Sequence, residues 1–264
     1  MERKTPLMET QTIQSWPRAD QQGQVGQITL FCIPYSGASA SFYRAWSNKH
    51  PMINICPIEL PGHGMRISEP LYTSIAPLIE DAAKTILNHL PGQFAFFGHS
   101  MGALISYELT RYLSANYRAE PVHLFVSGHG APDYQDAEPP IHELPDEEFI
   151  EKIHEMNSTD EAFFACTELR EMFLPILRAD FTVCETYQYQ PGASLRCPIT
   201  ALGGIGDLSV PRSALEAWKT HTSRPFKVLM FSGDHFFLKQ HMAIIMEILA
   251  RELLGGGTPV CYPI

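Results

Sequence analysis

Phe94-Ala95-Phe96-Phe97-Gly98-His99-Ser100-Met101-Gly102 is the stretch that decides the fold of this chain. The apolar residues before Gly98 are typical of a buried strand, and the residues from Ala103 to Leu109 follow the period of a helix. The G-x-S-x-G pattern is weak evidence by itself, but between a strand and a helix it indicates a nucleophile elbow. We therefore predict that Ser100 lies on a tight turn at the top of a sheet and presents its hydroxyl as a nucleophile.

The regions on either side of this stretch alternate between predicted strands and helices. Strands are expected over 28–33, 53–60, 122–127, 198–204 and 226–231, and helices through 42–46, 74–90, 211–221 and 237–254. Such βα units imply an α/β fold with a mostly parallel central sheet and helices on both faces. Residues 132 to about 190 interrupt the alternation with acidic and helical segments, and we interpret them as a lid insertion above the strand ends. We expect one domain over residues 1–264.

Composition excludes several classes of function. The net charge of −10 argues against nucleic acid and anionic membrane surfaces as partners. The polar N-terminal segment predicts neither a signal peptide nor an anchor, and no apolar run has the length of a membrane span. The six cysteines lack C-x-x-C spacing and are expected to be reduced: Cys32, Cys56, Cys166, Cys184, Cys197 and Cys261. We expect a cytoplasmic monomer.

A serine nucleophile needs a histidine base and a carboxylate that orients it. In this fold the chain order is serine, acid, histidine, and the last two residues follow late strands. His235 directly follows the last predicted strand, and Asp207 follows the strand before it, so we assign these two to the triad with Ser100. Asp234 and Asp180 are the alternative acids.

The second requirement is a pair of backbone N–H groups that bind the oxyanion. Met101 supplies the first, as the residue after the nucleophile, and Ser36, in the loop after the first strand, is expected to supply the second, with Tyr35 as the alternative. The sequence has no metal-ligand spacing, no Walker A motif and no G-x-G-x-x-G after a strand. We therefore expect no metal and no cofactor.

Taken together, these segments resemble the type II thioesterases that accompany modular polyketide and nonribosomal peptide synthetases. The resemblance runs from about residue 28 to 240. It rests on FCIPYSGA from Phe31, YRAW from Tyr43, ELPG from Glu59, FGHSMGA from Phe97, FVSG from Phe125, LPILRAD from Leu174, LGG from Leu202 with Asp207, and GDHFF from Gly233. One departure is His63, because the family usually has arginine after Pro-Gly.

The resemblance implies an α/β-hydrolase fold and hydrolysis of acyl thioesters carried on the phosphopantetheine arm of acyl or peptidyl carrier proteins. Such enzymes clear stalled or mis-primed acyl groups. The alternatives are a general serine esterase or lipase and a non-catalytic binding protein of the same fold. We expect the carrier protein to dock near the entrance, with Arg44 or Arg66 as a contact unless each forms an ion pair within the chain. Some apolar residues of the insertion should line the acyl pocket, drawn from Phe149, Ile153, Met156, Phe163, Phe164, Met172, Phe173, Leu174 and Leu177.

Overall fold

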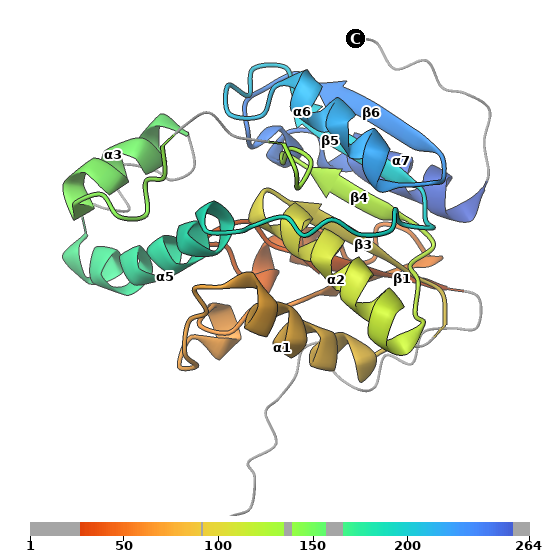
Figure 1. Ribbon diagram of the computed structural model, residues 1–264, viewed down its shortest axis with the longest axis horizontal. Coiled ribbons are helices and arrows are strands. Elements are labelled where there is room, and N and C mark those ends of the chain that lie inside the picture. Colours follow the sequence, from red (N-terminus) through yellow and green to blue (C-terminus); the bar gives the residue numbers. More distant parts are fainter. Residues whose placement is uncertain (1–26, 91, 135–138, 157–165, 256–264) are drawn as a thin grey trace, which may run out of the picture.

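The computed structural model describes residues 27–90, 92–134, 139–156 and 166–255 of the chain (Figure 1). Within them, six strands form one sheet in the order β2-β1-β3-β4-β5-β6. Every neighbouring pair is parallel. The strands are β1 (Ile28–Ile33), β2 (Ile53–Pro57), β3 (Phe94–His99), β4 (Leu124–Ser127), β5 (Ile199–Gly204) and β6 (Phe226–Phe231). The predicted α/β architecture is confirmed.

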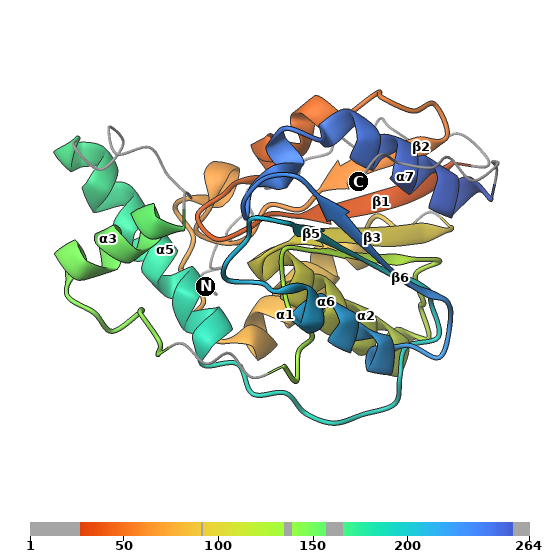
Figure 2. The ribbon, with the colours of Figure 1, turned by 90° about the horizontal axis from the view of Figure 1, so that it is seen from above.

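Helices cover both faces of this sheet (Figure 2). The α-helices are α1 (Ile75–Leu87), α2 (Met101–Tyr117), α3 (Asp146–Glu155), α5 (Thr167–Glu185), α6 (Arg212–Glu216) and α7 (Met242–Leu254). Short 3-10 helices are η1 (Ala40–Trp46), η2 (Gly64–Arg66), η3 (Ala217–His221) and η4 (Phe237–Lys239). None of the helices in the described ranges is long and apolar enough to cross a membrane.

Two apolar cores lie on opposite faces of the sheet, because alternate side chains of a strand point to opposite sides. In β1, Phe31 and Ile33 join the core beneath α1, α2 and α6, whereas Leu30 and Cys32 join the core beneath η1 and α7. All six residues of β1 are buried, as expected for a strand inside a parallel sheet. The sheet is therefore a rigid platform for the loops at its carboxyl edge.

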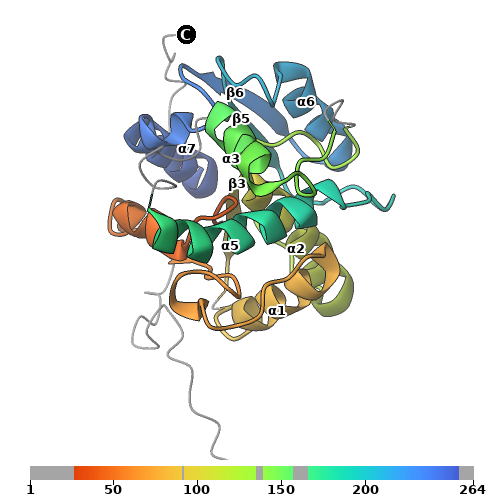
Figure 3. The ribbon, with the colours of Figure 1, turned by 90° about the vertical axis from the view of Figure 1, so that its left-hand side faces the viewer.

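The expected interruption of the alternation is a helical insertion between β4 and β5. Figures 1 and 3 show α3 and α5 beyond the carboxyl ends of the strands. They share a small core of their own, made of Ile141, Phe149, Ile150, Ile153, Leu174 and Leu177. Phe163 and Phe164 lie outside the described residues.

Some boundaries differ from the sequence-based expectation. The segment 237–254 is split into η4 and α7, and 211–221 is split into α6 and η3. The apolar period continues across the first break, with Leu238 and Ile245 both buried, so the pattern does not reveal it. The second strand ends at Pro57 rather than at Leu60, although Ile58 and Leu60 remain buried.

Candidate active site

Ser100 connects β3 to α2 in a conformation that an L-residue rarely adopts. Its φ is +52° and its ψ is −125°, a strain that costs about 1–3 kcal/mol. The flanking glycines make the turn possible. A Cβ on Gly98 would lie 1.9 Å from the carbonyl oxygen of Gly102, and one on Gly102 would lie 2.2 Å from that of Ile33. The start of α2 therefore packs directly on β1, and Ser100 lies at the tip of the turn, as the sequence predicts.

The two predicted oxyanion donors come from the start of α2 and from the loop after β1. Met101 is the first residue of α2, and the first N–H groups of a helix have no partner within the helix. Ser36 lies in a turn closed by a 3.0 Å hydrogen bond from the Ala38 N–H to the Tyr35 carbonyl oxygen. Ser36 and Ser100 line the same cavity.

Asp207 and His235 are in direct contact. The ring Nδ1 of His235 donates to Oδ2 of Asp207 at 2.7 Å, and only 1% of the Asp207 side chain is exposed. The other oxygen, Oδ1, accepts the N–H groups of Ser209 at 3.0 Å and Val210 at 3.2 Å. The carboxylate is thus held on both sides, and it leaves Nε2 of His235 available for another partner.

The alternative acids make different contacts. Oδ1 of Asp234 accepts the N–H of Phe236 at 2.8 Å, which closes a local turn. Asp180 lies on α5, where its carboxylate accepts the N–H of Gly37 and a ring proton of His63. Of the three carboxylates, Asp207 is the one in hydrogen-bond contact with His235.

His99 lies directly beneath the candidate site. It is fully buried, its Nδ1 is 2.9 Å from the Ser127 hydroxyl, and its ring centre is 5.1 Å from that of His235. Burial, with the nearby His235 as a smaller cause, lowers the pKa of His99 well below its usual value. His99 is therefore a neutral ring against which His235 packs.

A cavity of about 750 Å³ opens beside Ser100 and His235. Its walls come from the loop after β4, from the segment after β5 and from the insertion. Among the predicted pocket residues that the structure describes, Met156 lines it, whereas Phe149, Ile153, Leu174 and Leu177 pack inside the insertion. Sequence reasoning missed the other lining residues of the insertion, among them Ile141, Phe181, Cys184, Glu185, Tyr187 and Tyr189.

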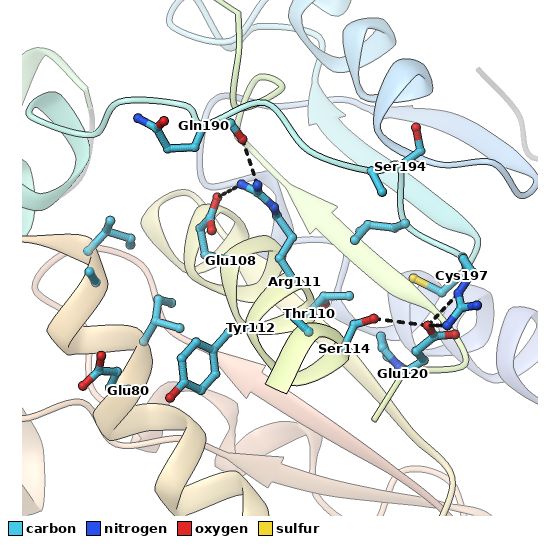
Figure 4. A pocket seen from close by; sticks show the side chains of 18 of the residues that line it. Glu80, Glu108, Thr110, Arg111, Tyr112, Ser114, Glu120, Gln190, Ser194 and Cys197 are labelled. Carbon is cyan, nitrogen blue, oxygen red and sulfur yellow. Dashed lines mark hydrogen bonds and ion pairs between the residues drawn. The ribbon is translucent and has the colours of Figure 1, made fainter. Parts of the chain in front are cut away.

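A second hollow, of about 840 Å³, lies between α1, α2 and the segment 187–197 (Figure 4). Its two arginines are already paired. Arg111 bonds to Glu108 and to the Gln190 carbonyl oxygen, and Arg196 bonds to Glu120. None of the five predicted site residues lines this hollow, whereas Ser36, Ser100 and His235 line the other cavity.

Arg66, one of the two predicted carrier-protein contacts, is engaged within the chain, because it forms ion pairs with Glu69 at 2.6 Å and with Asp81 at 2.8 Å. In the parts of the chain that the structure describes, no three histidine, cysteine or acidic side chains gather as metal ligands. The cysteines of those parts are free thiols: Cys32, Cys56, Cys166, Cys184 and Cys197. Cys261 lies outside the described residues.

Comparison with known proteins gives consistent results. A family model described as "Thioesterase domain" matches residues 28–253. Linear gramicidin dehydrogenase LgrE of Brevibacillus parabrevis is 44% identical over 248 residues, which cover 91% of this chain and 94% of LgrE. Gramicidin S biosynthesis protein GrsT of Aneurinibacillus migulanus is 43% identical over 228 residues, covering 86% and 89%.

Among solved structures, that of the type II thioesterase BorB from the borrelidin biosynthetic cluster superposes with a TM-score of 0.80 at 34% identity. The match covers 87% of this chain and 94% of BorB. The name of LgrE denotes a dehydrogenase, but the family model and BorB both denote thioesterases. The family model spans most of the chain, and the fold is that of BorB. This chain therefore belongs to the thioesterase family, whose α/β-hydrolase fold it has, and it is a hydrolase that acts on thioesters.

Proposed function

We propose that Ser100, His235 and Asp207 are the catalytic triad of this thioesterase. The observation that carries the proposal is the 2.7 Å hydrogen bond between His235 and the buried Asp207, at the wall of the cavity that Ser100 also lines. Asp207 fixes the ring so that Nδ1 holds a proton and Nε2 is free to accept one. The neighbouring carboxylate of Asp234 instead accepts the N–H of Phe236.

The reaction then has two halves. The Ser100 oxygen attacks the thioester carbonyl carbon while His235 takes the hydroxyl proton, and the backbone N–H groups of Met101 and Ser36 bind the oxyanion. When the carbon–sulfur bond breaks, the leaving thiolate takes the proton from His235. In the second half, His235 takes a proton from water, the resulting hydroxide attacks the acyl-serine, and the proton returns to Ser100 as the acid leaves.

The substrate we propose is an acyl group on the phosphopantetheine arm of an acyl or peptidyl carrier protein, and the role is removal of stalled or mis-primed acyl groups. Support comes from relatives whose names place them in gramicidin and borrelidin biosynthesis. The insertion over about 132–190 would act as a lid, since Met156 and Phe181 bring apolar surface to the cavity. A general esterase function has less support, because the family model that matches this chain is that of a thioesterase.

We also propose that the chain acts as a single-domain monomer in the cytoplasm. The free cysteines of the described ranges agree with a reducing compartment. Because the chain has a net charge of −10, long-range attraction to an acidic carrier protein would be weak. Recognition would then depend on a small docking surface at the cavity entrance rather than on Arg66, which is already paired.

The test compares one acyl group in three forms: on a carrier protein, on free pantetheine and as a simple oxygen ester. We expect the highest kcat/KM for the protein-borne thioester and the lowest for the oxygen ester, with Ser100→Ala inactive on all three. Equal kcat/KM values for the protein-borne and the pantetheine thioester would show that the enzyme does not recognise the carrier protein. A preference for the oxygen ester would favour a general esterase.

A further inference from the structure

The carboxylate of Asp180 joins three segments that are far apart in the sequence. Asp180 lies on α5 and is 4% exposed. Its Oδ2 accepts the N–H of Gly37 at 2.7 Å and faces Nε2 of His63 at 2.9 Å. Gly37 belongs to the loop after β1 that also holds Ser36, and His63 to the segment after β2. The proposed lid helix is therefore bonded to the proposed oxyanion loop.

The partners of the two ring nitrogens show which protonation state of His63 this arrangement requires. Nδ1 lies 2.9 Å from the carbonyl oxygen of Pro61, which can only accept a proton, so Nδ1 must donate. Nε2 faces the carboxylate of Asp180, which accepts a hydrogen bond when it is ionised, so Nε2 also donates. A histidine that donates from both nitrogens is the positively charged imidazolium. His63 and Asp180 therefore form a buried ion pair at the position where the family usually has arginine.

The surroundings of His63 favour the charged form. Burial lowers the pKa of His63, but the hydrogen bond and charge of Asp180, the Pro61 carbonyl and the charge of Glu59 together raise it above its usual value. Within the described residues, the charged groups that face His63 are Asp180 from α5 and Glu59 from the segment after β2. The Cys184 thiol lies near Asp180 and is held neutral by burial, which raises its pKa. Because its pKa is raised, His63 keeps its proton to a higher pH than an ordinary histidine does, and the ion pair breaks as pH rises through that pKa.

The oxyanion loop depends on this contact. Gly37 has a φ of +75°, and a Cβ there would lie 2.6 Å from Cδ2 of Leu177. Leu177 and Asp180 are three residues apart and so lie on the same side of α5. The face of α5 that carries Leu177 and Asp180 thus packs against Gly37, and the Asp180 carboxylate accepts the Gly37 N–H. Because that N–H belongs to the peptide group joining Ser36 to Gly37, the bond orients the residue whose own N–H is the proposed oxyanion donor.

We propose that Asp180 and protonated His63 are positioning residues, which hold the Ser36–Gly37 peptide in the orientation that the oxyanion requires. This inference rests on the proposed function. When His63 loses its proton, Asp180 is left as a buried carboxylate without a counter-charge, which is strongly unfavourable. The carboxylate must then move or take up a proton, and either change weakens its bond to Gly37. The loss of one oxyanion donor lowers kcat by about 10²–10³-fold.

The test is a pH profile of kcat and of KM for an acyl-pantetheine thioester, with the rate of Ser100→Ala subtracted at each pH. For the wild type we expect kcat to fall on the alkaline side while KM stays constant. His63→Arg, whose charge does not titrate, should remove that fall, since arginine stays protonated. His63→Gln, which is never charged, should have the low kcat at every pH. His89→Gln, a change at a histidine that bonds to Thr85 on α1, is the matched control and should keep the wild-type profile.

Asp180→Leu keeps nearly the size of the side chain and removes the acceptor of the Gly37 N–H, so it tests the same contact independently of His63. We expect its kcat to fall by about tenfold to 10³-fold with KM unchanged, and its thermal unfolding curve shows whether it is folded. The proposal is overturned if His63→Arg retains the wild-type fall of kcat at high pH, or if folded Asp180→Leu keeps the wild-type kcat. If instead Ser100→Ala hydrolyses the thioester like the wild type, the proposed function itself has failed.

Discussion

Replacing Asp207 by asparagine tests the proposed triad at its most constrained point. In the structure, Oδ2 accepts from His235 while Oδ1 accepts two backbone N–H groups, from Ser209 and Val210. The amide of Asp207→Asn has one oxygen and one NH₂ group for these two sides. If the NH₂ faced the backbone donors, two hydrogen bonds would be replaced by donor–donor contacts, at a cost of about 1–3 kcal/mol for each unsatisfied buried group.

The variant will therefore keep its oxygen toward the backbone and turn its NH₂ group toward His235. Nδ1 of His235 must then accept, which places the ring proton on Nε2, where it cannot take the proton of Ser100. We expect kcat to fall by roughly 10⁴-fold through this wrong tautomer. That factor corresponds to about 5.5 kcal/mol of transition-state stabilisation. The free energy of unfolding should change far less, since the backbone bonds of the side chain are retained.

The assay is steady-state hydrolysis of one acyl-pantetheine thioester, with thermal unfolding measured on the same samples. Asp234→Asn is the matched control, because its amide oxygen can still accept from the Phe236 N–H, the group that the Asp234 carboxylate contacts. We expect the control to keep nearly the wild-type rate. The reasoning is refuted if Asp207→Asn stays within about tenfold of the wild type, or if Asp234→Asn is the slower variant.

Four further variants test particular residues of the proposed site and of the insertion. Ser100→Ala should lower the rate of thioester hydrolysis by about a million-fold with the fold retained, and a near-normal rate would exclude the serine mechanism. Ser100→Gly should be equally inactive, but its free energy of unfolding in urea should be higher by about 1 kcal/mol, since glycine relieves the strain of φ +52°. An unchanged or lower urea midpoint would show that this strain does not reduce the stability of the wild type. In the insertion, Phe149→Ala should cost about 3–5 kcal/mol of unfolding free energy because Phe149 is fully buried. Phe181→Ala should instead shift the acyl-length preference in kcat/KM, and identical preferences of Phe181→Ala and the wild type would argue against an acyl-binding lid.

Much of the candidate site could be predicted from sequence, because its residues follow strands of a parallel sheet. The carboxyl ends of such strands meet at one edge, so a loop after β3, one after β5 and one after β6 must come together. This reasoning located Ser100, Asp207 and His235 without any knowledge of distances. It preferred Asp207 to Asp234 because Asp207 follows the strand before the last one, and the structure places a backbone N–H rather than His235 against Asp234.

The insertion shows where the sequence pattern stops being informative. A helical period identifies which residues face an apolar surface, but it does not say which surface that is. Phe149 and Ile153 have the same periodic character as Met156, yet they fill the small core between α3 and α5, while Met156 reaches the cavity. The difference arises from how the two helices pack on each other, which depends on contacts between residues far apart in the chain.

The sequence by itself therefore determined the α/β sheet, the elbow and the residues at the strand ends, because each depends on local pattern and on chain order. Only the tertiary structure decided the contact of Asp180 with His63 and Gly37, which are 117 and 143 residues away along the chain. No local pattern encodes that pairing. It forms because the docking of α5 over the strand ends brings a carboxylate against two loops that the sheet already holds in place.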